Sequence, residues 1–207
     1  FTSDNGSRLD DQGGSNGVLR GRKGTTWEGG QRVPCIMRWP GNIKAGEVRT
    51  ELAATIDLFP TLAGLTGAST PQDRTIDGKD ISSLMFADQP IDSPRSEFFY
   101  YDGNNLEAVR DGKWKLHVRK SDQVINELYD LESDPGETSN ICDSHPDIVA
   151  RLGVLLNLCR SDLGDEINGI VGENVRPSGR VENPDTLTHY DPEHPYIYAE
   201  YDKAERG

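Results

Sequence analysis

The chain has little of what marks several protein classes. Three cysteines in 207 residues are too few and too irregular for a disulfide scaffold or a zinc site. No apolar run is long enough to cross a bilayer, and the Walker pattern of a nucleotide-binding loop is absent. Since 34% of the residues are hydrophobic, a chain of this length can still bury a core. We therefore expect a globular protein without a membrane span.

Basic charge is also scarce, because 22 Lys and Arg stand against 35 Asp and Glu, a net charge of -13. Residues 1–50 hold eight basic and five acidic side chains, a net of +3, so the remainder carries -16. Nucleic-acid binding requires a basic face that neutralises phosphates. We therefore expect no nucleic-acid partner, and we interpret most of the acidic charge as a solvated surface.

The three cysteines leave the redox compartment open. Cys142 and Cys159 flank a helical pattern and could form a disulfide, although the sequence does not bring their Cβ atoms together. The odd count leaves at least one thiol, such as Cys35, free or paired outside these residues.

The first part of the chain is predicted to consist of loops that connect short strands and helices. Residues 7–22 are rich in Gly, Ser, Asn and Asp and lack an apolar period, which is typical of a surface loop. Residues 32–40 alternate like a short half-buried strand that stops at Pro40, and residues 81–86 form a short amphipathic piece.

A helix is predicted after Asp57, where an N-cap aspartate precedes a proline in the first turn. The spacing places Leu58, Leu62 and Leu65 on one face, and Gly67 ends the helix.

From residue 97 the sequence changes to aromatic and β-branched runs separated by the Asp-Gly pairs that favour hairpins. This pattern predicts about four antiparallel strands, at residues 98–101, 106–110, 113–118 and 127–131. A helix from Pro146 to about Cys159, capped by Ser144 or His145, would complete the core. Its inward residues would be Ile148, Leu152, Leu155 and Leu156.

The acidic tail from residue 161 holds four of the seven tyrosines, which favours an arm docked on a folded body. These tyrosines are Tyr190, Tyr196, Tyr198 and Tyr201.

Two short motifs carry candidate chemistry. Asp4 and Asn5 offer a carboxylate and an amide carbonyl before Gly6, and such hard oxygen donors suit calcium or magnesium. Lys23 lies between Gly21 and Gly24 with threonines beside it, which suits a tetrahedral oxyanion. Each motif alone is most often an ordinary turn.

Taken in this order and spacing, the motifs resemble the sulfatase family of the alkaline-phosphatase-like superfamily. About two thirds of the chain takes part in the resemblance. The matching segments are residues 1–6, 19–34, 39–41, 56–62, 77–78, 109–115 and 128–135.

The resemblance implies a hydrolase of sulfate esters, aryl or carbohydrate, in which Asp4 and Asn5 bind calcium and Lys23 contacts the sulfate. It also implies that His117, in the carboxyl-terminal sheet, can face the substrate; a surface or buried structural histidine is the alternative. Glu28, Gly29, Gly30 and Arg32 would shape the loop and its packing rather than act chemically. An exported protein, periplasmic, extracellular or lysosomal, is favoured by the resemblance.

The family's nucleophile, a formylglycine made in a Cys/Ser-x-Pro/Ala-x-Arg motif, has no counterpart in these residues. Because Phe1 begins in what reads as a strand already under way, we expect an amino-terminal half of the same protein to supply it. Two alternatives stay open: a phosphate or phosphonate ester hydrolase of the same superfamily, and a non-catalytic module that kept the fold.

The expected fold class is α/β. Residues 1–94 would be the carboxyl-terminal part of an alkaline-phosphatase-like α/β sandwich, and residues 95–160 a small antiparallel sheet with a packed helix. Residues 161–207 would be the acidic arm.

Overall fold

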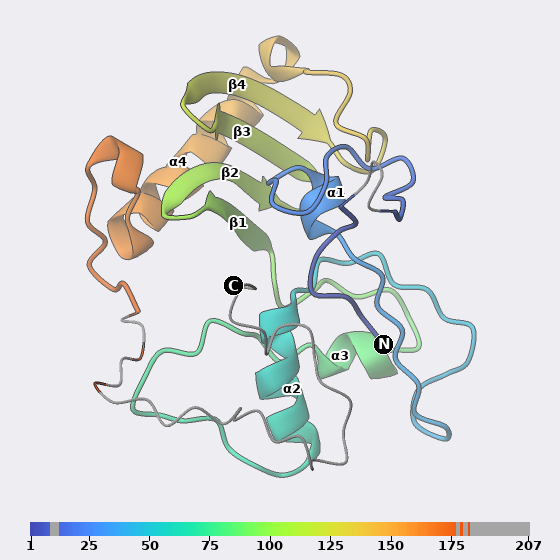
Figure 1. The fold of residues 1–207 in the computed structure, drawn as a ribbon. Helices are drawn as coiled ribbons and strands as arrows, with labels where there is room; N and C mark the ends of the chain where they lie inside the picture. The colour runs from blue at the N-terminus through green and yellow to red at the C-terminus, as the bar shows by residue number, and fades with distance from the viewer. Residues whose placement is uncertain (9–12, 177–178, 180–181, 183–207) are drawn as a thin grey trace, which may run out of the picture. The chain divides into compact units, whose positions relative to one another are not determined.

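The computed structural model describes residues 1–8, 13–176, 179 and 182. Its contacts divide the chain into one compact unit from Phe1 to Val175 and a second from Arg176 to Gly207. All elements given below belong to the first unit (Figure 1). The four tyrosines of the predicted arm lie outside the described residues, and the predicted divisions near residues 94 and 160 stay predictions.

Across the described ranges, none of the helices has both the length and the apolar character that a membrane crossing requires.

A four-stranded antiparallel sheet, with its strands in chain order, is the main element of the first unit (Figure 1). It confirms the predicted number and direction of strands. The strands are β1 (Glu97–Asp102), β2 (Asn105–Asp111), β3 (Trp114–Lys120) and β4 (Gln123–Asp130).

The hairpins follow the turn residues. Gly103 and Gly112 take positive φ angles of 57°, as the two Asp-Gly pairs predicted. The third turn has no glycine, and Ser121 adopts φ 49° instead. Its backbone N–H donates a hydrogen bond of 2.6 Å to a carboxylate oxygen of Glu107, which holds this unfavourable conformation.

One face of the sheet is apolar and packs on helix α4 (Pro146–Leu163). Leu152 and Leu156 are fully buried against the strands, as predicted, and Gly164 ends the helix with φ 88°. His145, one of the two residues predicted to cap the helix, occupies the N-cap but makes no side-chain capping hydrogen bond. The buried residues of this core are Leu106, Val109, Leu116, Leu128, Leu152, Leu156 and Cys159.

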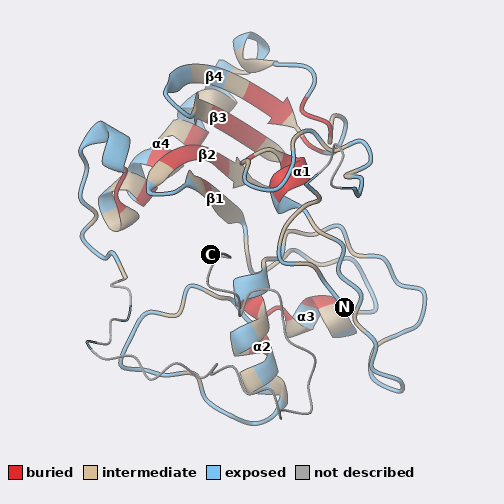
Figure 2. Ribbon diagram, in the orientation of Figure 1, coloured by how far each residue is buried: buried red, intermediate tan, exposed pale blue. Residues whose placement is uncertain are grey.

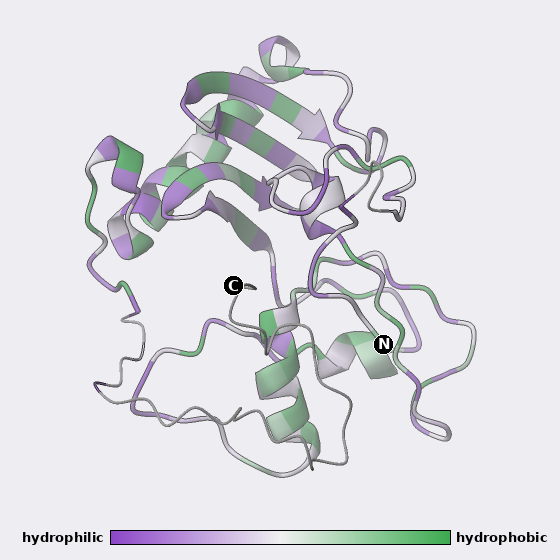
Figure 3. Cartoon of the chain, viewed as in Figure 1, coloured by the Kyte–Doolittle hydropathy of each residue, from purple (hydrophilic) through white to green (hydrophobic). Residues whose placement is uncertain are grey.

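The opposite face carries polar side chains that are also buried, among them Glu107, Lys115 and His117. Figure 2 shows buried residues along the strands, and Figure 3 shows hydrophilic residues interspersed with hydrophobic ones there. Since side chains alternate along a strand, Lys115 and His117 of β3 point away from Leu116. Residues 20–31, which include the short helix α1 (Glu28–Gln31), cover them. The sheet is therefore covered on both sides by different chemistry.

The predicted strand at residues 32–40 is wrong. Cys35 makes an isolated bridge with Thr2, supported by backbone hydrogen bonds between Phe1 and Ile36. Pro34 and Pro40 have no N–H to donate, and the paired segment turns away after Thr2. Pairing therefore does not propagate.

Helix α2 (Leu58–Leu65) starts where predicted, but the face shared by Leu58, Leu62 and Leu65 is not its buried face. Leu62 is 56% exposed, whereas Thr61 is buried, where its hydroxyl accepts the Ile81 N–H at 3.0 Å. Asp57 occupies the N-cap of α2, as predicted, but its side chain makes no capping hydrogen bond, because its carboxylate accepts two other backbone N–H groups and pairs with Arg95. The remaining elements are η2 (Thr55–Asp57), α3 (Ser82–Phe86), η3 (Cys142–Ser144) and η4 (Glu166–Asn168).

All three cysteines are free, so the possible Cys142–Cys159 disulfide is not formed. Cys159 is buried in the core, where its sulfur lies 3.3 Å from the hydroxyl of Tyr101.

Candidate functional site

The backbone brings the two sequence motifs together. The N–H of Gly6 donates to the carbonyl of Gly30 at 3.0 Å, and the N–H of Lys23 donates to the carbonyl of Ser7 at 2.9 Å. The segment after Asp4 and Asn5 therefore runs directly beside residues 20–28, which carry Lys23 and are called the lysine loop. These hydrogen bonds join residues that the sequence separates by 16 or more positions.

Glycines allow this close approach. A Cβ on Gly6 would lie 1.7 Å from the carbonyl oxygen of Gly29, and a Cβ on Gly30 would lie 2.2 Å from the oxygen of Thr25. No side chain fits at either place. The prediction that these glycines shape the loop is consistent with this packing.

Asp4 and Asn5 line one pocket of about 600 Å³. The Asp4 side chain is exposed, and one of its oxygens accepts a long hydrogen bond of 3.4 Å from Ser3. Nowhere in the described part of the chain do three or more His, Cys, Asp or Glu side chains gather as a metal group. The two oxygen donors therefore fit a hard cation as part of a ligand set, and the prediction that they bind calcium stays a prediction.

Lys23 is exposed at the tip of a tight loop. Gly21 and Gly24 have φ angles of 83° and 82°, and the N–H of Thr25 closes the turn on the carbonyl of Arg22 at 3.0 Å. Within the described ranges, no hydrogen bond or ion pair engages the Lys23 ammonium group. It is therefore available to an anion, and its predicted contact with sulfate stays a prediction.

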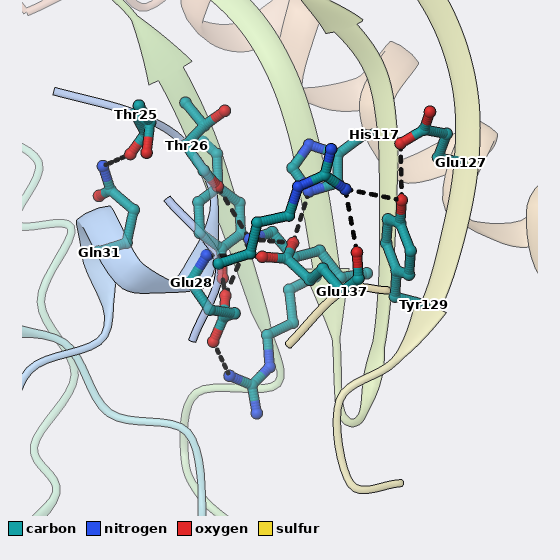
Figure 4. Close-up of polar contacts among 12 residues, drawn as sticks. Thr25, Thr26, Glu28, Gln31, His117, Glu127, Tyr129 and Glu137 are labelled. Carbon is teal, nitrogen blue, oxygen red and sulfur yellow. Dashed lines mark hydrogen bonds and ion pairs between the residues drawn. The ribbon is translucent and has the colours of Figure 1, made fainter. Parts of the chain in front are cut away.

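The lysine loop rests on a buried network of charges, shown in Figure 4. Lys115 is fully buried, and its ammonium group lies 2.9 Å from a carboxylate oxygen of Glu28 and 2.9 Å from one of Glu137. It also donates to the carbonyl of Thr26 at 2.8 Å. The hydroxyl of Tyr100 donates to Glu28 at 3.0 Å. The loop is thus held to the polar face of the sheet by hydrogen-bonded ion pairs.

His117 lies inside this network and is fully buried. Its Nε2 is 2.7 Å from Glu137, and because a carboxylate only accepts, Nε2 carries the proton. Trp27 covers the ring at a centroid distance of 4.3 Å. Burial, with the positive charge of Lys115 second, lowers the pKa of His117 far below its ordinary value. The ring is neutral and contacts neither pocket, so its substrate-facing role stays a prediction without support from this geometry.

A second pocket of about 360 Å³ opens beside the same loop. On its wall, Thr26 donates to Glu107 at 2.5 Å, and Lys120 lies 3.3 Å from the same carboxylate and 4.0 Å from the centre of the Trp27 ring. Burial lowers the pKa of Lys120 to about 8. The pocket is also lined by Arg20, Gly24, Thr25, Asp102, Ser121, Gln123, Ile125 and Glu127.

Sequence reasoning missed Lys115, Glu137, Glu107 and Lys120 as members of this region. Lys115 gave a signal, because a lysine that alternates with Leu116 within a strand points to the face opposite the core. Glu137 gave none, since it lies in a loop after β4 and reaches the network through tertiary contacts alone.

Residues 22–161 match the family model described as N-sulphoglucosamine sulphohydrolase, C-terminal. The chain is 46% identical over 178 residues to steryl-sulfatase of Mus musculus, covering 66% of this chain and 28% of that protein. It is 39% identical over 171 residues to arylsulfatase A of Bos taurus, covering 70% and 33%.

A sulfatase from Pseudoalteromonas sp. has a similar solved structure, with a TM-score of 0.69 and 28% identity over 76% of this chain and 35% of that one. The chain thus spans about a quarter to a third of the relatives it matches. The family model, the relatives and the fold agree, and the chain belongs to the sulfatase family, of which it represents the carboxyl-terminal region.

Proposed function

We propose that this chain forms part of a calcium-assisted sulfuric ester hydrolase that acts on an aryl or carbohydrate sulfate ester. The observation that carries the proposal is the pairing of the two motifs, in which Gly6 bonds to Gly30 and Lys23 bonds to Ser7. Oxygen donors for a cation and an exposed ammonium group for an anion are thereby held on adjacent backbone segments.

Lys23 has the anion-binding role. Its positive charge, unopposed by the described side chains, binds the sulfate oxygens and offsets the negative charge that grows as the ester bond breaks. The glycine turns fix the backbone below it, so the charge is oriented before the substrate arrives.

Asp4 and Asn5 would hold the calcium ion together with ligands from elsewhere in the protein, since calcium takes about six to eight oxygens. Bound there, the ion would supply a positive charge that polarises the sulfate ester. The two residues would orient the ion toward the lysine loop, because they directly precede Gly6 and Ser7, whose backbones bond to Gly30 and Lys23.

The nucleophile would come from an amino-terminal half of the same protein, as a formylglycine. Exposed apolar side chains support a packing partner for this region: Phe1 is 84% exposed, and Ile36, Phe59 and Leu62 are also exposed. By its likeness to the family, the whole protein would be exported.

The proposal is tested in the full-length protein with an aryl sulfate. Lys23→Ala should lower kcat by about 10²- to 10³-fold, the loss typical of removing one charge-stabilising donor. Lys44→Ala is the matched control, because Lys44 is exposed and pairs with Glu47 outside the site. Equal kcat values for the two variants would refute the role of Lys23, and faster turnover of a phosphate ester would favour the alternative hydrolase.

Asp4→Ala should abolish the rise in melting temperature that calcium gives the wild-type protein, because a cation that binds the folded state stabilises it. Asp88→Ala, an exposed aspartate away from the pocket, should retain that rise. A rise that survives in Asp4→Ala would remove Asp4 from the ligand set.

A further inference from the structure

Glu137 contacts both ends of the lysine loop. At one end, the guanidinium of Arg20 donates to the backbone carbonyl of Glu137 at 3.0 Å. At the other end, the backbone N–H of Glu28 donates to its carboxylate at 2.7 Å. Lys23 lies between these two points in the sequence. The ends are also tied to each other, since Gly29 donates its N–H to the carbonyl of Arg20 at 2.7 Å.

The carboxylate of Glu137 is fully engaged and fully buried. One oxygen accepts the Glu28 N–H, and the other accepts from His117 at 2.7 Å and from Lys115 at 2.9 Å. Figure 4 shows Glu137 between the sheet and the loop. Its backbone has φ 51°, an uncommon conformation for a residue with a side chain, which the surrounding hydrogen bonds maintain.

We infer that Glu137 is a positioning residue that sets the place of Lys23 by clamping both ends of the loop that carries it. This inference rests on the proposed function of Lys23. Glu137 touches neither pocket and does not contact the substrate itself. It acts through the loop, whose geometry it couples to the rigid sheet through Lys115 and His117.

Glu137→Gln weakens the carboxylate half of the clamp and leaves the size of the side chain almost unchanged. Both oxygens accept hydrogen bonds in the wild type, so a glutamine amide must direct its NH₂ group at another donor on one side or the other. The change also removes a negative charge beside the buried Lys115. The loop should then be held less firmly at its Glu28 end, while the Arg20 bond to the backbone carbonyl remains and Lys23 keeps its chemistry.

The test uses the full-length protein and a double-mutant cycle. Glu137→Gln should lower kcat about 10²-fold, the size of loss that a misplacement of about 1 Å produces. The double variant with Lys23→Ala should be no slower than Lys23→Ala alone, because an unpositioned lysine and an absent one are equivalent. Losses that multiply in the double variant would overturn the inference.

Trypsin cleavage after Arg22 and Lys23 gives a readout that does not depend on activity. In the native protein, Glu137→Gln should speed cleavage at these bonds and leave other sites unchanged. Asp165→Asn is the control, because this buried aspartate pairs with Arg160 and has no contact with the loop. It should leave both kcat and loop cleavage unchanged. Unchanged loop cleavage in Glu137→Gln would overturn the inference.

Arg20→Lys supplies a second variant at the opposite end of the loop, where the side chain is more exposed. It should give a smaller loss of kcat with the same non-additivity toward Lys23→Ala, and it decides the question if Glu137→Gln does not fold. A wild-type protein inactive on sulfate esters would refute the proposed function, while the cleavage result would still decide whether Glu137 holds the loop.

Discussion

Both faces of the small sheet contain fully buried side chains, but one face is apolar and the other is charged. The face toward α4 is made of leucines and valine, whereas the face toward residues 20–31 contains Lys115, His117 and the carboxylates that pair with them. Apolar contacts are non-directional and tolerate small shifts. Hydrogen-bonded ion pairs fix distance and orientation, although desolvation offsets much of their attraction.

The difference teaches that one sheet serves two purposes. The apolar face supplies stability through the area it removes from water. The charged face supplies a defined place for the lysine loop, where the proposed anion-binding group must be oriented. A variant on either face should therefore have its own signature, and four measurements test that separation.

The largest effect is expected from Lys115→Met, which keeps much of the side-chain volume but leaves Glu28 and Glu137 without their shared cation. Breaking a buried ion pair on one side costs about 3–5 kcal/mol of unfolding free energy, measurable by urea denaturation. Lys113→Met is the control, because Lys113 pairs with Asp130 near the surface and should cost much less. Similar losses of unfolding free energy for Lys115→Met and Lys113→Met would show that the buried ion pairs stabilise the protein no more than an ion pair near the surface.

On the apolar face, Leu152→Ala should lower the unfolding free energy by about 2–5 kcal/mol through lost burial and the cavity that remains. Leu158→Ala, on the exposed side of the same helix, should change it little. In the full-length protein, neither variant should lower kcat of the folded fraction. A loss of kcat in the folded fraction of Leu152→Ala would show that the apolar face also affects catalysis.

The charged face should also make stability depend on pH. Burial lowers the pKa of His117 in the folded state far below its value in the unfolded chain. Below about pH 6.5, this histidine is therefore protonated in the unfolded chain but stays neutral in the folded one. The contribution of His117 to the unfolding free energy should be constant above that pH. Below it, this contribution should fall by at most about 1.4 kcal/mol per pH unit. Urea denaturation from pH 8 to pH 5 should show a shallower fall in His117→Gln. Identical slopes would contradict the buried neutral state.

The smallest effect tests whether the apolar face is wholly non-directional. Tyr101 packs on that core and donates its hydroxyl to the carbonyl of Gly164 at 2.8 Å, where α4 ends. Tyr101→Phe should lower the unfolding free energy by about 1 kcal/mol. If Tyr101→Phe were as stable as the wild type, the area buried on this face would account for its contribution to stability. If the loss were as large as that of Leu152→Ala, directional hydrogen bonding would also be important on this face.

The sequence predicts the local features well. Asp-Gly pairs located two hairpins, Pro146 marked the start of the long helix, and the spacing of its leucines identified the buried side. These signals act between residues close in the chain. The Ser121 turn escaped prediction because its support comes from Glu107, a residue on another strand.

Long-range pairing limits the rest. Residues 32–40 alternate like a strand, yet a strand requires a neighbour, and among the described residues only Thr2 pairs with this segment, in one isolated bridge. Leu62 belongs to an apolar helical pattern, but in the described structure few side chains pack over it, and it is 56% exposed. For the site, the motifs identified Asp4, Asn5 and Lys23 as candidates, whereas Glu137 could not be found, because its importance lies in contacts with residues more than 100 positions away.

The contact between Gly6 and Gly29 has a consequence for how such a chain tolerates genetic variation. The two backbones touch where side chains are missing, so one added methyl group at residue 6 would push the segment that carries Asp4 and Asn5, the proposed calcium ligands, away from Gly29. Every acid, amide and ammonium group would still be present in such a protein. If Asp4, Asn5 and Lys23 act as proposed, inherited changes at this place would be loss-of-function alleles although they alter no chemical group of the proposed site.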